Sequence, residues 1–114
     1  MARFEVDIFN KSLEVDLHNY STGTALTVAR EKIKEAYEHG FRHVKLIHGA
    51  AGIMNKNDGG SIKFELRSML RRGELDKWID KKGSESRDES LILVLRKNPT
   101  PVDEEWKEMP IEDY

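Results

Sequence analysis

Residues 13–18 have the sequence LEVDLH and residues 42–48 the sequence RHVKLIH, and these two stretches decide the fold. In the first stretch apolar and polar side chains alternate, which predicts a strand buried on one face. The second stretch is also rich in apolar residues and predicts another strand. Between them, apolar residues recur at helical spacing over residues 25–37, with Ser21 as a suitable N-cap and Gly40 as a suitable helix stop. A strand, a helix and a strand in this order predict a right-handed βαβ unit with parallel strands.

The rest of the chain adds another helix and further strand candidates. A second apolar stripe predicts a helix that Ser61 caps and Gly73 ends. Residues 77–79 predict a weak strand or a turn, and residues 82–89 predict a polar connection. Residues 90–95 (SLILVL) are the most apolar run in the chain and predict a central strand. The order β-α-β-α-β-β predicts an α/β two-layer sandwich, in which both helices cover one face of a four-stranded mixed sheet.

A chain of 114 residues has the size of one domain. We expect residues 1–12 to form an N-terminal arm or edge strand, residues 13–98 to form the domain, and residues 99–114 to form an acidic tail. From Asp103 onward the tail has six acidic side chains and one basic one, and without them 18 basic residues face 15 acidic ones, a net charge of +3. This charge permits nucleic-acid binding without demanding it. The tail itself is predicted to be either a docked arm or a segment that binds a protein partner.

Composition excludes several classes of protein. The chain has no cysteine, so it can form neither a disulfide framework nor a thiolate metal site. Its first five residues, MARFE, lack the apolar stretch of a signal peptide, and no apolar run reaches the length of a membrane span. We therefore expect a cytoplasmic protein that has no membrane partner.

Polar side chains that can carry chemistry end both strands of the predicted βαβ unit. Asp16 and His18 end the first strand on the same face, and His48, followed by Gly49, ends the second. The carboxyl ends of parallel strands meet at one edge of a sheet, and ligands favour that edge, so one acid and two histidines could converge there. The backbone N–H groups of the following loop and helix start could hold a phosphate beside them. From these residues alone, a polar exit from each strand is the commoner explanation.

In their context the same residues resemble the Smr (small MutS-related) domain family. The first family motif corresponds to Val15-Asp16-Leu17-His18-Asn19, and the helix start that follows it corresponds to Ser21-Thr22-Gly23-Thr24-Ala25-Leu26. The second motif corresponds to Leu46-Ile47-His48-Gly49, with Gly59-Gly60 ahead of Ile62. The resemblance covers Leu13 to Lys97.

The resemblance implies a fold similar to that of the C-terminal domain of bacterial translation initiation factor three, and it implies binding or nicking of DNA or RNA. Asp16 and His18 correspond to the acid and histidine of the first motif, and His48 and Gly49 to the histidine and glycine of the second. The chain departs from the family pattern at Asn19, where the family has glycine, and at residues 50–51, which are Ala-Ala instead of Lys-Gly.

We expect Asp16, His18 and His48 to be the catalytic residues, because a histidine can act as a general acid or base near neutral pH. Mg²⁺ is the cofactor to consider, but one carboxylate supplies few of the oxygen ligands that it prefers, so we favour acid–base chemistry over a preformed metal site. Nucleic-acid contacts are expected from the second loop and helix, where a basic ridge recurs every four residues and could follow a phosphate backbone. The expected contact residues are Gly49, Gly52, Lys56, Gly59, Gly60, Lys63, Arg67 and Arg71.

Three functions are compatible with these features. The leading hypothesis is an Smr-type endonuclease that nicks DNA or RNA, which Asp16 and His18 favour. The second is a non-catalytic nucleic-acid-binding module of the same fold, which Ala50-Ala51 favours. The third is a protein-interaction domain that uses the acidic tail.

Overall fold

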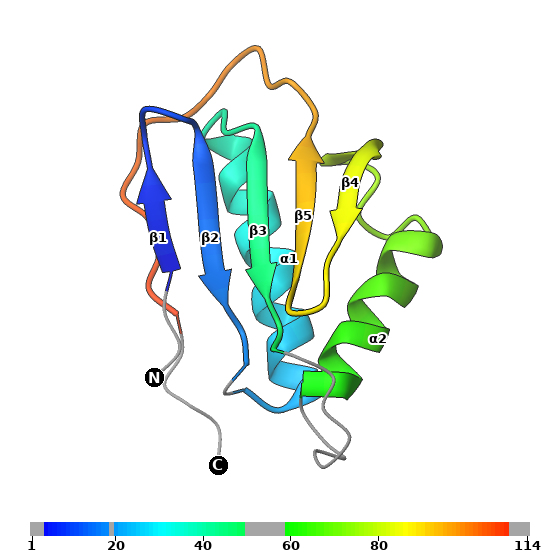
Figure 1. Cartoon of the computed structure of the whole chain (residues 1–114). Coiled ribbons are helices and arrows are strands. Elements are labelled where there is room, and N and C mark those ends of the chain that lie inside the picture. The colour runs from blue at the N-terminus through cyan, green and yellow to red at the C-terminus, as the bar shows by residue number, and fades with distance from the viewer. Residues whose placement is uncertain (1–3, 19, 50–58, 110–114) are drawn as a thin grey trace.

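The computed structural model describes residues 4–18, 20–49 and 59–109, which form five strands and two helices (Figure 1). In chain order the elements are β1 (Phe4–Asp7), β2 (Ser12–Asp16), α1 (Thr22–Glu38), β3 (His43–Ile47), α2 (Gly59–Arg71), β4 (Ile79–Ser86) and β5 (Ser90–Leu95). None of the helices in this part of the chain is long and apolar enough to cross a membrane.

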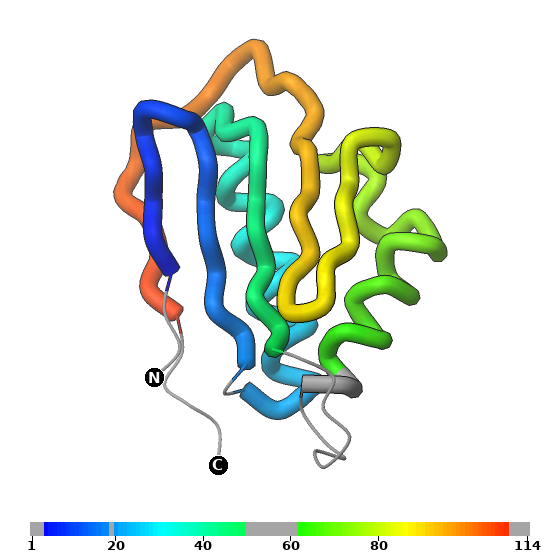
Figure 2. Tube along the Cα trace, in the orientation of Figure 1, coloured from blue at the N-terminus to red at the C-terminus, as the bar shows by residue number. Residues whose placement is uncertain are grey.

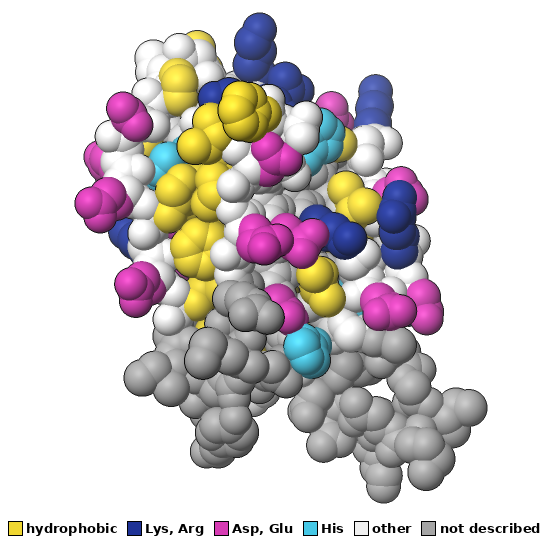
Figure 3. Space-filling model, turned by 60° about the vertical axis from the view of Figure 1, so that its left-hand side comes forward, with side chains coloured by type: hydrophobic (Ala, Val, Ile, Leu, Met, Phe, Trp, Pro, Cys, Tyr) yellow, Lys and Arg dark blue, Asp and Glu magenta, His cyan; other side chains and the backbone are white. Residues whose placement is uncertain are grey.

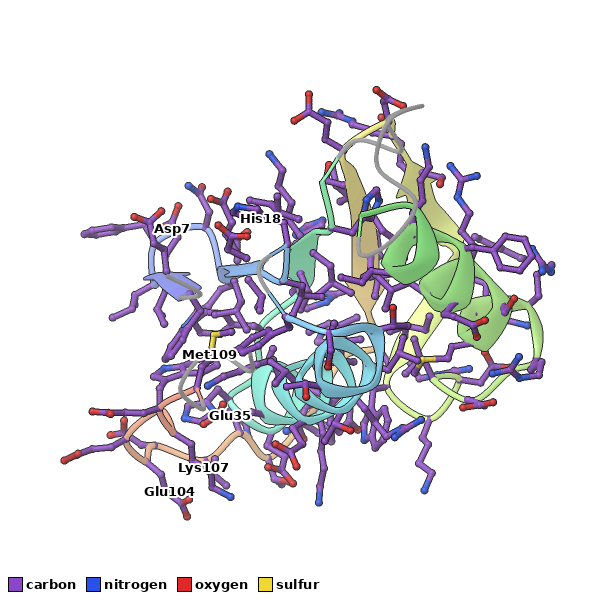
Figure 4. All side chains as sticks on the ribbon, turned by 90° about the horizontal axis from the view of Figure 1, so that it is seen from below. Asp7, His18, Glu35, Glu104, Lys107 and Met109 are labelled. Carbon is purple, nitrogen blue, oxygen red and sulfur yellow. The ribbon has the colours of Figure 1, made fainter. Side chains whose placement is uncertain are left out.

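The strands form one mixed sheet in the order β1-β2-β3-β5-β4. Strands β2 and β3 are parallel, with Leu13 opposite Val44 and Asp16 opposite Ile47, whereas all other neighbouring pairs are antiparallel. The parallel pair, joined by α1, confirms the predicted βαβ unit. Both helices lie on the same face of the sheet, as the view from below in Figure 4 makes clear.

The sheet has five strands rather than the four expected, because residues 4–7 pair with β2 as an antiparallel edge strand. Phe4 and Val6 pack against the core, while Glu5 and Asp7 are exposed. Apolar and acidic side chains alternate in this segment, as in a strand that has one face on the core, and its place at the edge of the sheet agrees with the expected edge strand.

Both predicted helix stops are helix ends in the structure. Gly40 and Gly73 have φ angles of +79° and +78°, in the left-handed region that favours glycine. At the start of α1, the hydroxyl of Ser21 accepts a hydrogen bond from the N–H of Thr24 at 3.4 Å, as an N-cap does. Helix α2 begins at Gly59, so Ser61 lies within its first turn instead of preceding it.

The prediction that residues 82–89 are only a connection was wrong, because most of them belong to β4. This strand pairs with β5 in an irregular register, which passes from Asp80 opposite Val94 to Glu85 opposite Ile92. The extra residues bring Gly83 against Val94, where an added Cβ would lie 2.5 Å from a methyl carbon of that valine. Backbone pairing at a bulged edge does not need an apolar pattern, so the polar sequence concealed the strand.

The core lies between the sheet and the helices. It contains alternate residues of the three inner strands and the inward faces of α1 and α2, with Tyr20, Phe41 and Leu75 from the connections. Tyr20 and Phe41 come from the connections on either side of α1, and Leu75 follows α2. Figure 2 shows the path of the chain around the core.

The described part of the acidic tail packs against α1 and β1. The ring of Trp106 stacks on His39 with centroids 4.0 Å apart, and it also contacts the rings of Phe41 and Phe4, at 5.0 and 6.3 Å. Figure 3, which brings the β1 side of the molecule forward, shows Asp and Glu side chains around a hydrophobic band. Over residues 99–109 the tail is therefore a docked arm.

A buried ion pair fastens this arm to α1. Lys32 and Glu35 are only 4% and 7% exposed, and their side chains form an ion pair with the Lys32 Nζ and a Glu35 carboxylate oxygen 2.8 Å apart. The other Glu35 oxygen accepts a hydrogen bond from the backbone N–H of Lys107 at 2.7 Å, and Lys32 donates to the carbonyl oxygen of Lys107. Lys32 also lies 3.7 Å from the centre of the Phe4 ring. The labelled Glu35 and Lys107 can be followed in Figure 4.

Candidate active site at the carboxyl edge of the parallel strands

Asp16 is the last residue of β2, and its carboxylate holds His18. One carboxylate oxygen accepts the backbone N–H of His18 at 3.1 Å and also hydrogen bonds to Nδ1 of the same histidine. Because an ionised carboxylate can only accept, Nδ1 carries the proton, and in the neutral ring Nε2 has the free lone pair. The two side chains are 25% and 48% exposed. The pair is thus oriented and open to solvent.

Asp16 opens onto the face of the sheet opposite the helices. It lines a shallow hollow together with Phe4, Glu5, Glu14 and Ile47. Figure 1 shows the ends of β2 and β3 together at the lower edge of the sheet. This edge is where the sequence predicted the site.

His48 follows the end of β3 and is buried, with 1% of its surface exposed. Its Nδ1 donates to the carbonyl oxygen of Gly49 at 2.7 Å. The backbone N–H groups of His48 and Gly49 both donate to the carbonyl oxygen of Glu89, at 3.0 and 3.1 Å. Burial lowers the pKa of His48 below its usual value, and the positive charges of Lys63 and Arg67 lower it further. The ring is therefore neutral at pH 7.

The structure brings Asp16 and His18 together, but it places His48 in a different environment. His18 is open to solvent beside Asp16, whereas His48 is enclosed near the basic residues of α2. The two histidines thus have different chemical capabilities, although both strand ends lie at one edge. Of these two histidines, His18 is the one that is exposed to solvent.

The glycines expected to contact nucleic acid are only partly described. Gly49 has a φ of +88°, a conformation that favours glycine directly after His48. Gly59 and Gly60 are the first two residues of α2. Gly52 and Lys56 lie outside the described residues.

Two members of the basic ridge on α2 reach the β4–β5 hairpin. Lys63 Nζ lies 3.2 Å from the carbonyl oxygen of Asp88 and 3.4 Å from its carboxylate. Arg67 donates through Nε to the hydroxyl of Ser86 at 2.7 Å. These contacts direct the ridge toward β4.

Arg71, the third member of the ridge, donates to the hydroxyl of Ser68 at 3.2 Å. Together with Arg67 it lines a groove between α2 and β4, and Lys81 and Ser84 complete the polar wall of that groove with Ser86. The sequence did not indicate the residues from β4, because that segment was expected to be a connection. The pattern that these β4 residues form in the sequence, a cation and two serines within six residues, is too common to indicate a binding site.

The donor set at the strand ends does not fit a preformed Mg²⁺ site. Asp16 is the only carboxylate of the pair, and one of its oxygens is already held by His18. Among residues 4–18, 20–49 and 59–109, no three acidic or histidine side chains are grouped so that they could hold a metal ion. Mg²⁺ prefers several oxygen ligands, and the described residues at this edge do not supply them.

The Smr domain model matches residues 15–94, which is more than half of the chain. The match begins in β2, just before Asp16, and ends in β5, so it includes both helices and all the strand ends described above. No curated protein and no solved structure matches the chain significantly. The Smr family is associated with the binding and nicking of nucleic acid, and this chain belongs to the Smr domain family.

Proposed function

We propose that this domain binds DNA or RNA and nicks it by acid–base hydrolysis, with His18 as the proton-transferring group. The observation that supports this most directly is the hydrogen bond between Asp16 and Nδ1 of His18 at an exposed strand end. An exposed histidine with a fixed ring and a lone pair on Nε2 is suited to general base catalysis at neutral pH.

In the proposed reaction, Nε2 of His18 takes a proton from a water molecule as the water oxygen attacks phosphorus. The bond between phosphorus and the leaving oxygen breaks, and that oxygen takes up a proton, either from the imidazolium or from solvent. Asp16 fixes the ring through Nδ1 and stabilises the imidazolium that forms. The carboxylate thus has a positioning role, since it meets the ring rather than the substrate.

His48 has a supporting role in this proposal. Its burial and its lowered pKa make it a neutral group at pH 7, and its hydrogen bonds to Gly49 and Glu89 hold the strand end against the β4–β5 hairpin. We propose that it shapes the turn at Gly49, while Lys63, Arg67 and Arg71 bind phosphates of the backbone.

The test is incubation of the purified domain with supercoiled plasmid and with structured RNA, each with and without Mg²⁺. We expect His18→Ala to lower the nicking rate by about 10²–10⁴-fold, the usual contribution of a general acid or base. Asp16→Asn should lower it as well, because the amide does not stabilise the imidazolium. The matched control is His43→Ala, since His43 is an exposed histidine at the opposite end of β3. If His18→Ala nicks as fast as the parent and His43→Ala, the assignment of His18 is wrong.

A non-catalytic binding module is the second candidate, and Ala50-Ala51 favours it because the family has Lys-Gly at these positions. This candidate predicts binding without nicking by the parent protein. In either case Arg67→Ala should weaken binding to all sequences about equally and reduce the salt dependence by about one ion. Nicking by the parent that His18→Ala abolishes would exclude the second candidate.

A further inference from the structure

Helix α2 presents an exposed aromatic ring beside two arginines. Phe64 is 63% exposed, which is unusual for a ring of this size. Arg67 and Arg71 follow it by three and seven residues, so all three side chains lie on one stripe of the helix. The apolar face of α2, with Ile62, Leu66 and Met69, is turned into the core, so Phe64 does not serve packing.

The two arginines beside Phe64 have no carboxylate partner among the described residues. Each donates to a serine hydroxyl, Arg67 to Ser86 and Arg71 to Ser68. By contrast, Arg72 and Arg87 each lie 2.6–2.7 Å from a glutamate oxygen. A hydroxyl partner steers a guanidinium group without neutralising it, so Arg67 and Arg71 keep their charge for an anion.

The groove next to this stripe has the same character. Figure 2 shows α2 beside β4. The groove between them is lined by the cations Arg67, Arg71 and Lys81, by the hydroxyl groups of Ser84 and Ser86, and by the apolar side chains of Leu70 and Leu91. None of the described acidic residues lines it. The Ser84 hydroxyl oxygen is buried and has no hydrogen-bond partner in the described part of the chain. The groove is therefore complementary to a polyanion that also accepts hydrogen bonds.

We propose that the stripe of Phe64, Arg67 and Arg71, together with this groove, binds single-stranded nucleic acid. The inference rests on the proposed function and specifies its substrate. Phosphates occupy the cationic groove, and Phe64 stacks on an unpaired base. In a duplex the base faces are covered by their neighbours, so an aromatic side chain on a helix surface meets them only where the strand is unpaired.

The chain supplies a matched control for the aromatic ring. Phe9 is 98% exposed, but it lies in the β1–β2 turn, close in sequence to Asp7 and away from the cations of α2. A hollow at this end of the sheet has Glu5, Asp7 and Glu14 in its lining. None of the described basic residues lines this hollow, so Phe9 has no cationic groove beside it, and removal of this ring should leave binding unchanged.

The experiment measures fluorescence anisotropy of labelled oligo(dT) and oligo(U) of about 16 nucleotides, and of a mixed-sequence duplex, at low salt. The proteins are the parent, Phe64→Ala, Phe64→Trp and Phe9→Ala. We expect Phe64→Ala to weaken single-strand binding by at least about fivefold, the lower end for loss of one stacked base, and to leave duplex binding within about twofold. Phe64→Trp should retain parental affinity, and Phe9→Ala should behave as the parent. Because Phe64 is exposed, thermal melting should show that all the variants remain folded.

The outcomes separate this inference from the proposed function. If Phe64→Ala binds single strands as tightly as Phe9→Ala does, or if it loses single-strand and duplex binding equally, the stacking role is overturned while nucleic-acid binding stands. If the parent binds neither single strands nor duplex at low salt, the proposed function and this inference both fall.

Discussion

The buried ion pair between Lys32 and Glu35 allows a quantitative test of how the C-terminal tail is held against α1. In Glu35→Ala, Lys32 stays buried without its counter-ion, and the backbone N–H of Lys107 loses its acceptor. Removal of one member of a buried ion pair typically destabilises a protein by about 3–5 kcal/mol. For a domain of this size, such a loss lowers the Tm by about 10–20 °C.

The assay is thermal unfolding followed by far-UV circular dichroism, with Glu31→Ala as the matched control. Glu31 is on the same helix but is exposed, so its removal should change the free energy of unfolding by less than about 0.5 kcal/mol. The double variant Lys32→Met/Glu35→Leu should recover much of the loss, because it leaves no unpaired buried charge. The reasoning is refuted if Glu35→Ala melts within about 2 °C of Glu31→Ala.

Three further predictions concern single positions. Burial lowers the pKa of His48, so the unfolded chain binds a proton at this histidine more readily than the folded one. The free energy of unfolding should therefore fall as the pH is lowered through about 6.5 toward the pKa of the folded state. Urea titrations at several pH values should show a weaker pH dependence of the free energy of unfolding for His48→Gln. Gly40→Ala should destabilise the domain by about 1–3 kcal/mol, because φ is +79° and the new Cβ would lie 2.8 Å from Pro101. Gly23→Ala, in the first turn of α1 with no atom within 4 Å of the added Cβ, should be neutral or stabilising by about 0.5–1 kcal/mol in the same melts.

The part of the fold that follows from local chemistry could be predicted. The alternation over residues 13–18 placed Leu13 and Val15 in the core, and the glycines after α1 and α2 marked the helix ends. These signals are strong for two reasons. Burial of one face of a strand requires an apolar residue at every second position, and a helix end with a positive φ angle favours glycine.

Two features that could not be predicted from the sequence, strand β4 and the burial of the Lys32–Glu35 ion pair, depend on residues far away in the chain. Strand β4 is polar because it lies at a bulged edge, and its pairing with β5 is a property of the backbone. Lys32 and Glu35 are spaced like an ordinary surface pair, but in the fold they are covered by the tail, with Lys107, and Lys32 also by the ring of Phe4. No local pattern distinguishes a charged pair that will be covered from one that will stay in water.

The candidate site likewise has features that could be predicted from the sequence and features that could not. The spacing of Asp16 and His18 suffices to bring them together, because Asp16 ends β2 and His18, two residues later, lies within hydrogen-bond distance of its carboxylate. The burial of His48 depends on how α2 and the β4–β5 hairpin pack around it, which the sequence of β3 does not encode. The groove beside α2 likewise needs a strand that the sequence concealed.

Strand β5 and the arm that contains Lys107 are translated last, although earlier parts of the fold depend on them. On the ribosome, β3 emerges well before β5, the strand that separates it from β4, and Lys32 and Glu35 emerge about 70 residues before Lys107. Until those segments appear, a nascent chain has an unpaired strand edge and a charged pair that is only partly covered. Chains that end before residue 107 should therefore be cleaved by proteases more readily than the full chain.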